Sequence, residues 1–138
     1  MDFKVGVGKS DFAALRESGN YYIDKTELIY ELVCSYMLEY ENSQNRDQMK
    51  RAAIKQYQDK YSTYYVPLER REGLQDKIQE IMAYNIAYKD ASHLACAIYA
   101  GCEYLLTTDI RFQKRYKGNE IEILNPLEFT NRVEEEEI

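Results

Sequence analysis

The sequence predicts a single α/β domain in which helices cover both faces of a parallel β-sheet. A chain of 138 residues has the length of one domain, and its apolar share of 45% is enough to build a core. Helix-like and strand-like patterns alternate along the C-terminal half, which is typical of βαβ units and a parallel sheet. The expected architecture therefore has three layers, α/β/α.

The C-terminal half carries the clearest pattern. Asp90 is placed to cap a helix that ends at Gly101, where a glycine can adopt the left-handed conformation of a helix C-terminus. An apolar run then predicts a buried strand with Asp109 at its carboxyl end. The elements expected in this half are a helix over 90–100, a strand over 104–108, a short basic helix over 110–116, a strand over 121–124 and a helical turn at 127–129.

The middle of the chain predicts two amphipathic helices around a short strand. Residues 47–62 form a helical pattern, and residues 73–84 form a second. Between them, residues 64–66 are rich in strand-forming side chains and are stopped by Pro67. The side chains expected to face the core are Met49, Ala53, Ile54 and Tyr57 from the first helix and Leu74, Ile78, Ile81 and Met82 from the second.

The first forty residues allow more than one interpretation. A short helix is expected after Ser10 or Asp11, and residues 21–23 predict a strand that ends at Asp24. Residues 26–42 carry an apolar stripe at helical spacing, which favours one continuous helix. The alternative is a short helix followed by a strand.

Composition limits the class of protein. The net charge of −6 argues against a protein that binds nucleic acid through bulk positive charge, although removal of the acidic tail Glu134–Glu137, which we expect to fray, leaves about −2. We expect no membrane span or signal peptide. The three cysteines have no metal-binding spacing, and with apolar neighbours around Cys96 and Cys102 they predict free thiols in the cytosol.

Two local motifs invite functional readings that the sequence does not support. Gly8-Lys9-Ser10 resembles the end of a phosphate-binding loop, but Phe3 stands where the loop needs its first glycine, and no apolar strand is expected before it. His93 is the sole histidine and has no cysteine or histidine partner at ligand spacing. We therefore interpret it as a packed, hydrogen-bonded helix residue.

Two aspartates offer a metal site. In parallel α/β sheets, ligands bind beyond the carboxyl ends of the strands, which is where Asp109 is expected. Asp90 would start the helix that packs beside that strand, so the two carboxylates can meet. Divalent cations such as Mg²⁺ take oxygen ligands, often one or two protein carboxylates with water. Each aspartate is also a plausible helix cap, and that alternative stays open.

The same residues resemble a known family. Lys89–Ala97, Ala100-Gly101-Cys102 and Leu105–Asp109, followed by Ile123–Phe129, are similar to the C-terminal half of PIN domains. Ser35–Ser43 is similar to the segment that carries the second acid of that family. The resemblance covers about residues 33–130, and it favours a break near Cys34–Leu38 over one continuous helix.

The resemblance implies a metal-dependent endoribonuclease that hydrolyses RNA and holds Mg²⁺ or Mn²⁺ between acids. By position, Glu41, Asp90 and Asp109 would be the catalytic ligands, with Glu39 as the alternative to Glu41 and with Thr107 or Thr108 orienting ligands or water. Asp24 would be the first acid. Arg111, Lys114 and Arg115 follow Asp109 and are candidates for binding RNA phosphates, or else form a solvated helix face. Some PIN domains are toxins, so an antitoxin partner and a homodimer are expected as well.

The N-terminal segment departs from the PIN pattern. Between Asp24 and Glu41 there is room for one helix, whereas the family has roughly two. Val5–Phe12 and Tyr21–Ile29 instead resemble the opening of AAA-ATPase-like proteins that carry a PD-(D/E)XK nuclease domain. We therefore divide the chain into an atypical segment over 1–32 and a PIN-like domain over 33–138, truncated or rearranged at its N-terminus. A remnant that has lost nuclease activity and acts as a binding module is the alternative function.

Overall fold

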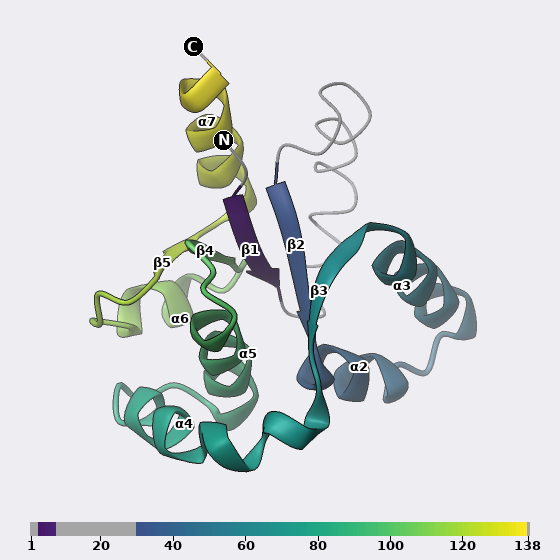
Figure 1. The fold of residues 1–138 in the computed structure, drawn as a ribbon, viewed down its shortest axis with the longest axis horizontal. Coiled ribbons are helices and arrows are strands. Elements are labelled where there is room, and N and C mark those ends of the chain that lie inside the picture. Colours follow the sequence, from purple (N-terminus) through teal and green to yellow (C-terminus); the bar gives the residue numbers. More distant parts are fainter. Residues whose placement is uncertain (1–2, 8–29, 138) are drawn as a thin grey trace.

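The computed structural model describes residues 3–7 and 30–137, which form a five-stranded, fully parallel sheet with the strand order β3-β2-β1-β4-β5 (Figure 1). The predicted α/β class and parallel sheet are thus confirmed. In chain order the elements are β1 (Phe3–Val7), β2 (Tyr30–Ser35), α2 (Tyr36–Ser43), α3 (Gln48–Tyr61), β3 (Ser62–Val66), two 3₁₀ turns (Leu68–Arg70 and Glu72–Leu74), α4 (Gln75–Met82), α5 (Tyr88–Tyr99), β4 (Tyr104–Leu106), α6 (Ile110–Arg115), β5 (Glu122–Leu124) and α7 (Pro126–Glu137).

Each face of the sheet carries its own hydrophobic core. On one face Val33, Leu105 and Ile123 pack with buried residues of α4, α5 and α6. On the other face Leu32, Leu106 and Leu124 pack with Ile54 and Tyr57 of α3 and Phe129 of α7. Successive strand residues therefore enter opposite cores, as the two faces of a strand require. The three predicted layers are present.

The centre of the sheet depends on a glycine. At Gly6 in β1, an added Cβ would lie 2.9 Å from Cβ of Ala97 on α5 and 3.2 Å from Cδ1 of Leu105. The helix axis can come this close to the strand because neither Gly6 nor Ala97 has a larger side chain. Lys4 Nζ also donates to the backbone oxygen of Ala100 at 3.4 Å, so α5 runs antiparallel to β1. The N-terminal half of α5 consequently lies toward the carboxyl end of β1.

The continuous helix predicted over residues 26–42 is wrong where the structure describes it. Tyr30–Ser35 is strand β2, and α2 starts at Tyr36 with the Ser35 hydroxyl accepting from Leu38 N–H at 3.4 Å. A central strand of a parallel sheet is buried on both faces, so its sequence is a continuous apolar run without alternation. When the apolar run of β2 is continued into α2, the spacing of its residues matches the apolar stripe of a helix. The break implied by the PIN resemblance is confirmed.

Several smaller predictions need correction. Met49 is 84% exposed rather than facing the core. Asp90 lies in the first turn of α5 and does not cap it, because the N-cap residue is Ala87. An apolar-containing strand, β1, does precede Gly8, although sequence reasoning expected none. The acidic tail expected to fray continues α7 as far as Glu137.

Other predictions are confirmed. Leu105 and Leu106 are buried in β4, as the apolar run predicts. Gly101 follows α5 with φ +78°, the left-handed conformation expected of it. The buried thiols are all free, and burial raises the pKa of Cys34 and Cys102 to about 12 and that of Cys96 to about 11.

Some expectations fall outside the described residues. The helix after Ser10 or Asp11, the strand over 21–23 and the carboxylate of Asp24 belong to this group.

The domain boundary proposed at residue 33 falls inside β2, which pairs with β1, so both parts contribute to one sheet. Among residues 3–7 and 30–137, no helix combines the length and the apolar character that a membrane crossing needs.

Gly6→Ala should destabilise the chain by about 1–3 kcal/mol, because the new methyl group has no space between Ala97 and Leu105. Gly73→Ala is the matched control: nothing lies within 4 Å of its added Cβ, so its free energy of unfolding should change by less than about 1 kcal/mol. Urea denaturation followed by circular dichroism measures both. Equal effects of the two substitutions would contradict the close packing of α5 on β1.

Candidate functional site

The candidate site lies at the carboxyl edge of the sheet. The helices α2 and α6 begin shortly after β2 and β4 end, so their first turns lie at this edge. The N-terminal half of α5 reaches the same edge because α5 runs antiparallel to β1. In open parallel sheets this edge, near the strand where the order reverses, is where ligands bind. Here the reversal occurs at β1, between β2 and β4.

Glu41 of α2 binds a residue of α5. Its carboxylate oxygen Oε1 shares a short hydrogen bond with Nε2 of His93. The His93 side chain is 4% exposed and that of Glu41 20%, so the contact is largely withdrawn from solvent. His93 is thus a packed, hydrogen-bonded helix residue, as predicted. Asp90 lies one helical turn before His93, so the contact brings Glu41 to the stretch of α5 that carries Asp90.

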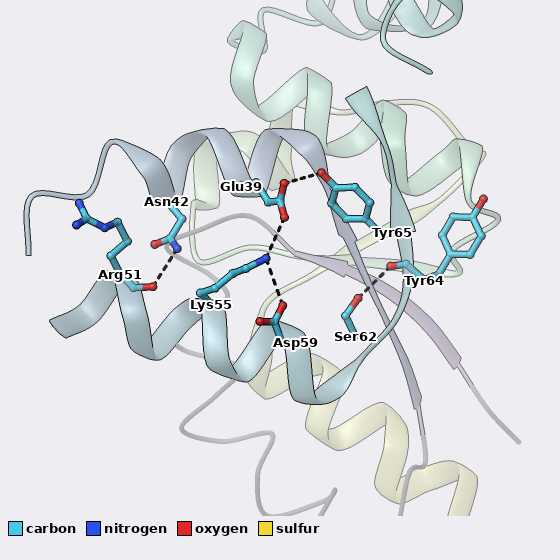
Figure 2. Close-up of polar contacts among 8 residues, drawn as sticks. All are labelled: Glu39, Asn42, Arg51, Lys55, Asp59, Ser62, Tyr64 and Tyr65. Carbon is cyan, nitrogen blue, oxygen red and sulfur yellow. Dashed lines mark hydrogen bonds and ion pairs between the residues drawn. The ribbon is translucent and has the colours of Figure 1, made fainter. Parts of the chain in front are cut away.

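Glu39 has different partners. Its Oε2 accepts from the Tyr65 hydroxyl at 2.7 Å, and its Oε1 lies 3.2 Å from Lys55 Nζ, which also pairs with Asp59 at 3.2 Å (Figure 2). The pKa of Lys55 is raised, mainly by its hydrogen bond to Glu39. These contacts tie α2 to α3 and β3. Of the two glutamates that could be the second acid, Glu39 is held by α3 and β3, and Glu41 contacts α5 through His93.

Asp109 caps α6, at the end of the short loop that follows β4. Its Oδ1 accepts from the backbone N–H groups of Arg111 and Phe112 at 2.9 and 3.3 Å. Thr107, which is buried, accepts from the backbone N–H of Asp109 at 3.0 Å and so fixes that residue. The capping role that the sequence left open for Asp109 is confirmed. Its side chain remains exposed at the carboxyl edge.

The basic residues of α6 are near Asp109 but not equivalent. Arg111 and Lys114 are exposed, and they lie three residues apart on one face of the helix. Arg115 is exposed as well, but its Nη1 donates to the backbone oxygen of Asn85 at 3.1 Å. That bond joins α6 to the turn before α5.

The carboxylates are chemically suited to a hard cation, but the described residues do not gather a full ligand set. Carboxylate oxygens are the donors that Mg²⁺ and Mn²⁺ take. Within residues 3–7 and 30–137, however, no three histidine, cysteine, aspartate or glutamate side chains lie close enough to hold a metal ion. Asp24, which the resemblance gives as the first acid of the set, lies outside those residues. The metal role of all four acids stays a prediction.

Sequence reasoning missed the polar network around Glu39 and the partner of Glu41. Lys55 and Asp59 are one helical turn apart on α3, which is a recognisable ion-pair spacing. Their connection to Glu39 and to Tyr65 joins separate elements and has no local signal. The same holds for the contact between Glu41 and His93.

Comparison with known proteins gives a consistent result. A family model described as "PIN domain" matches residues 15–118. VapBC2 from Rickettsia felis, solved bound to a DNA fragment from their promoter, is similar with a TM-score of 0.59 at 14% identity, over 91% of this chain and 98% of that chain. PAE2754 from Pyrobaculum aerophilum is similar with a TM-score of 0.60 at 17% identity, over 96% of each chain. At such identities the likeness shows the fold alone. A comparison with curated proteins gave no match.

The two glutamates of α2 should differ in their effect on stability. Glu41→Ala leaves Nε2 of the buried His93 without this acceptor and should cost about 1–3 kcal/mol. Glu39→Ala removes an exposed ion pair and should cost less than about 1 kcal/mol. Thermal and urea denaturation at neutral pH give both values. A more stable Glu41→Ala variant would show that repulsion among carboxylates outweighs the bond to His93.

Proposed function

The chain belongs to the PIN domain family, and on that premise we propose that it is a metal-dependent endoribonuclease that hydrolyses phosphodiester bonds in RNA. The observation that supports the proposal is the position of Glu41, Asp90 and Asp109. They come from α2, α5 and the N-cap of α6, and all three helices reach the carboxyl edge of the sheet. That edge is the usual site of chemistry in this class of fold.

We assign Glu41, Asp90 and Asp109 as the ligands of Mg²⁺ or Mn²⁺, with Asp24 as a fourth. The bound metal would polarise the phosphate and activate water. Asp109 is held in a fixed orientation by its two backbone partners and by Thr107, and such preorganisation favours catalysis. Thr108 is exposed beside Asp109, where its hydroxyl would orient water.

The basic residues after Asp109 are assigned to the RNA backbone. Arg111 and Lys114 are exposed on α6 and would contact phosphates next to the one that is cut. Arg115 would contribute charge while its guanidinium stays bound to Asn85. These side chains would concentrate positive charge at one place in a chain whose net charge is −6.

We further propose a biological setting. PIN domains include toxins of bacterial toxin–antitoxin pairs, and the fold shared with VapBC2 supports a toxin with an antitoxin partner. A homodimer is part of the same proposal. Free, buried thiols suit a reducing cytosol.

A second function has a specific observation in its favour. No three potential metal ligands gather within the described part of the chain. Two carboxylates would hold Mg²⁺ weakly and leave the attacking water poorly placed, and a misplacement on the order of 1 Å can lower the rate about a hundredfold. The alternative is therefore a PIN-like chain with weak or no nuclease activity that acts by binding a partner.

The test is cleavage of single-stranded RNA by the purified chain in Mn²⁺, followed by gel electrophoresis. We expect cutting that chelation abolishes and that falls at least about a hundredfold in Asp109→Asn. Asparagine caps helices as well as aspartate does, so the fold should be preserved while the ligand charge is lost.

Asp47→Asn is the matched control. Asp47 caps α3 through the same pair of backbone hydrogen bonds, from Met49 and Lys50, but lies outside the proposed site. It should cut RNA like the wild type. Metal-independent cleavage, or cleavage that Asp109→Asn leaves intact, would rule out the assigned site. No cleavage at all would favour the binding module.

A further inference from the structure

A cavity next to the proposed catalytic acids is lined by exposed aromatic rings. It has a volume of about 670 Å³ and lies between α2, β3, the first 3₁₀ turn and the start of α5. That volume is in the range of small-ligand sites, roughly 300–1,000 Å³. Among its lining residues are Tyr40, Tyr65 and Tyr88, which are 52%, 37% and 39% exposed, and Leu68, which is 57% exposed. Each tyrosine comes from a different element.

The charged residues in this cavity are predominantly positive. Arg71 and Lys89 line it, and neither forms an ion pair with any residue in the described part of the chain. Glu39 also lines it, but its carboxylate is already bound by Lys55 and by the hydroxyl of Tyr65 (Figure 2). Glu69 is near enough to contribute to the raised pKa of Tyr65, after burial and Glu39, but does not line the cavity.

The cavity adjoins the acids through two neighbouring residues. Tyr40 and Lys89 directly precede Glu41 and Asp90, and Lys89 Nζ lies 5.8 Å from the centre of the Tyr40 ring. Successive helix residues point in different directions. The aromatic cavity is therefore beside the carboxylates, where a nucleotide next to the cut phosphate would lie.

From these observations we propose that the cavity binds unstacked bases of single-stranded RNA. Tyrosine rings provide stacking surfaces for any base, and Arg71 and Lys89 provide charge for the adjoining phosphates. A chain of net charge −6 that nevertheless places Arg71 and Lys89 beside exposed rings is suited to an anionic, aromatic ligand. Duplex RNA keeps its bases stacked and would not fit. This inference rests on the proposed ribonuclease function and names the form of its substrate.

The test is fluorescence anisotropy with a labelled short oligouridylate in the presence of a chelator, so that binding is measured without metal-dependent cutting. We expect saturable binding of the single strand and much weaker binding of a duplex of the same length. Tyr40→Ala and Tyr88→Ala should each weaken binding about 5- to 100-fold, whereas Tyr40→Phe, which keeps the ring, should bind within about twofold of the wild type.

Two controls separate stacking from general damage. Tyr99 is 46% exposed on α5 but does not line the cavity, so Tyr99→Ala should bind RNA like the wild type. Arg71→Gln should make the negative slope of log affinity against log salt shallower by about 0.7, the value for one phosphate contact to a single strand. Melting temperatures should show that each variant is folded. We expect Tyr40→Ala to fold, because the side chain of Tyr40 is 52% exposed.

The outcomes distinguish the two proposals. Ring-dependent RNA binding without any cleavage in Mn²⁺ would support the stacking site and reject the nuclease. Cleavage by a chain whose RNA binding ignores Tyr40→Ala and Tyr88→Ala would reject the stacking site alone. If sedimentation shows instead that these two variants disrupt self-association and leave RNA binding unchanged, the cavity is a protein interface and the inference is wrong.

Discussion

The close contact between α5 and β1 is the constraint on which the arrangement of this chain depends. With no side chain on Gly6 and a methyl group on Ala97, the helix can lie against the central strand of the sheet. That contact sets both the height and the direction of α5. Its C-terminal end lies near Lys4 and its N-terminal half lies toward the carboxyl edge. The contact between α5 and β1 therefore positions Tyr88, Lys89, Asp90 and His93.

At the carboxyl edge, the acids are held by different partners. Like charges in one site raise at least one pKa and destabilise the fold. Three of these acids have separate partners: His93 for Glu41, Lys55 and Tyr65 for Glu39, and two backbone N–H groups for Asp109. These contacts attach each carboxylate to a different part of the fold: Glu41 to α5, Glu39 to α3 and β3, and Asp109 to the start of α6. They also keep Glu39 engaged with α3 and β3 and leave Glu41 as the acid that reaches α5.

The sequence predicted the C-terminal half well, because Gly101, the apolar residues of β4 and the cap at Asp109 are local signals. The fold class followed from the same alternation of elements. Prediction from the sequence failed where contacts with distant elements decide the secondary structure or the burial of a residue. In β2 both faces are buried, so Leu32, Val33 and Cys34 form a run that matches a helix as readily as a strand. In β1, Lys4 and Gly6 interrupt a short strand whose glycine is explained only by the approach of Ala97. Met49 fitted the apolar stripe of α3, yet its side chain is 84% exposed, so helical spacing alone did not identify the buried face. For the site, the acids could be named from their positions, but their partners lie on other elements and leave no trace in local spacing.

We propose that carboxylates from separate elements act as one metal site in the folded chain. A ligand that binds only the folded state raises the free energy of unfolding, by about 2.7 kcal/mol when its concentration is a hundred times its dissociation constant. The most direct measurement is therefore the melting temperature in millimolar Mn²⁺. We expect a rise of several degrees for the wild type and for Asp47→Asn, and a much smaller rise for Asp90→Asn and Asp109→Asn. No rise in the wild type, or an equal rise in all four proteins, would contradict it.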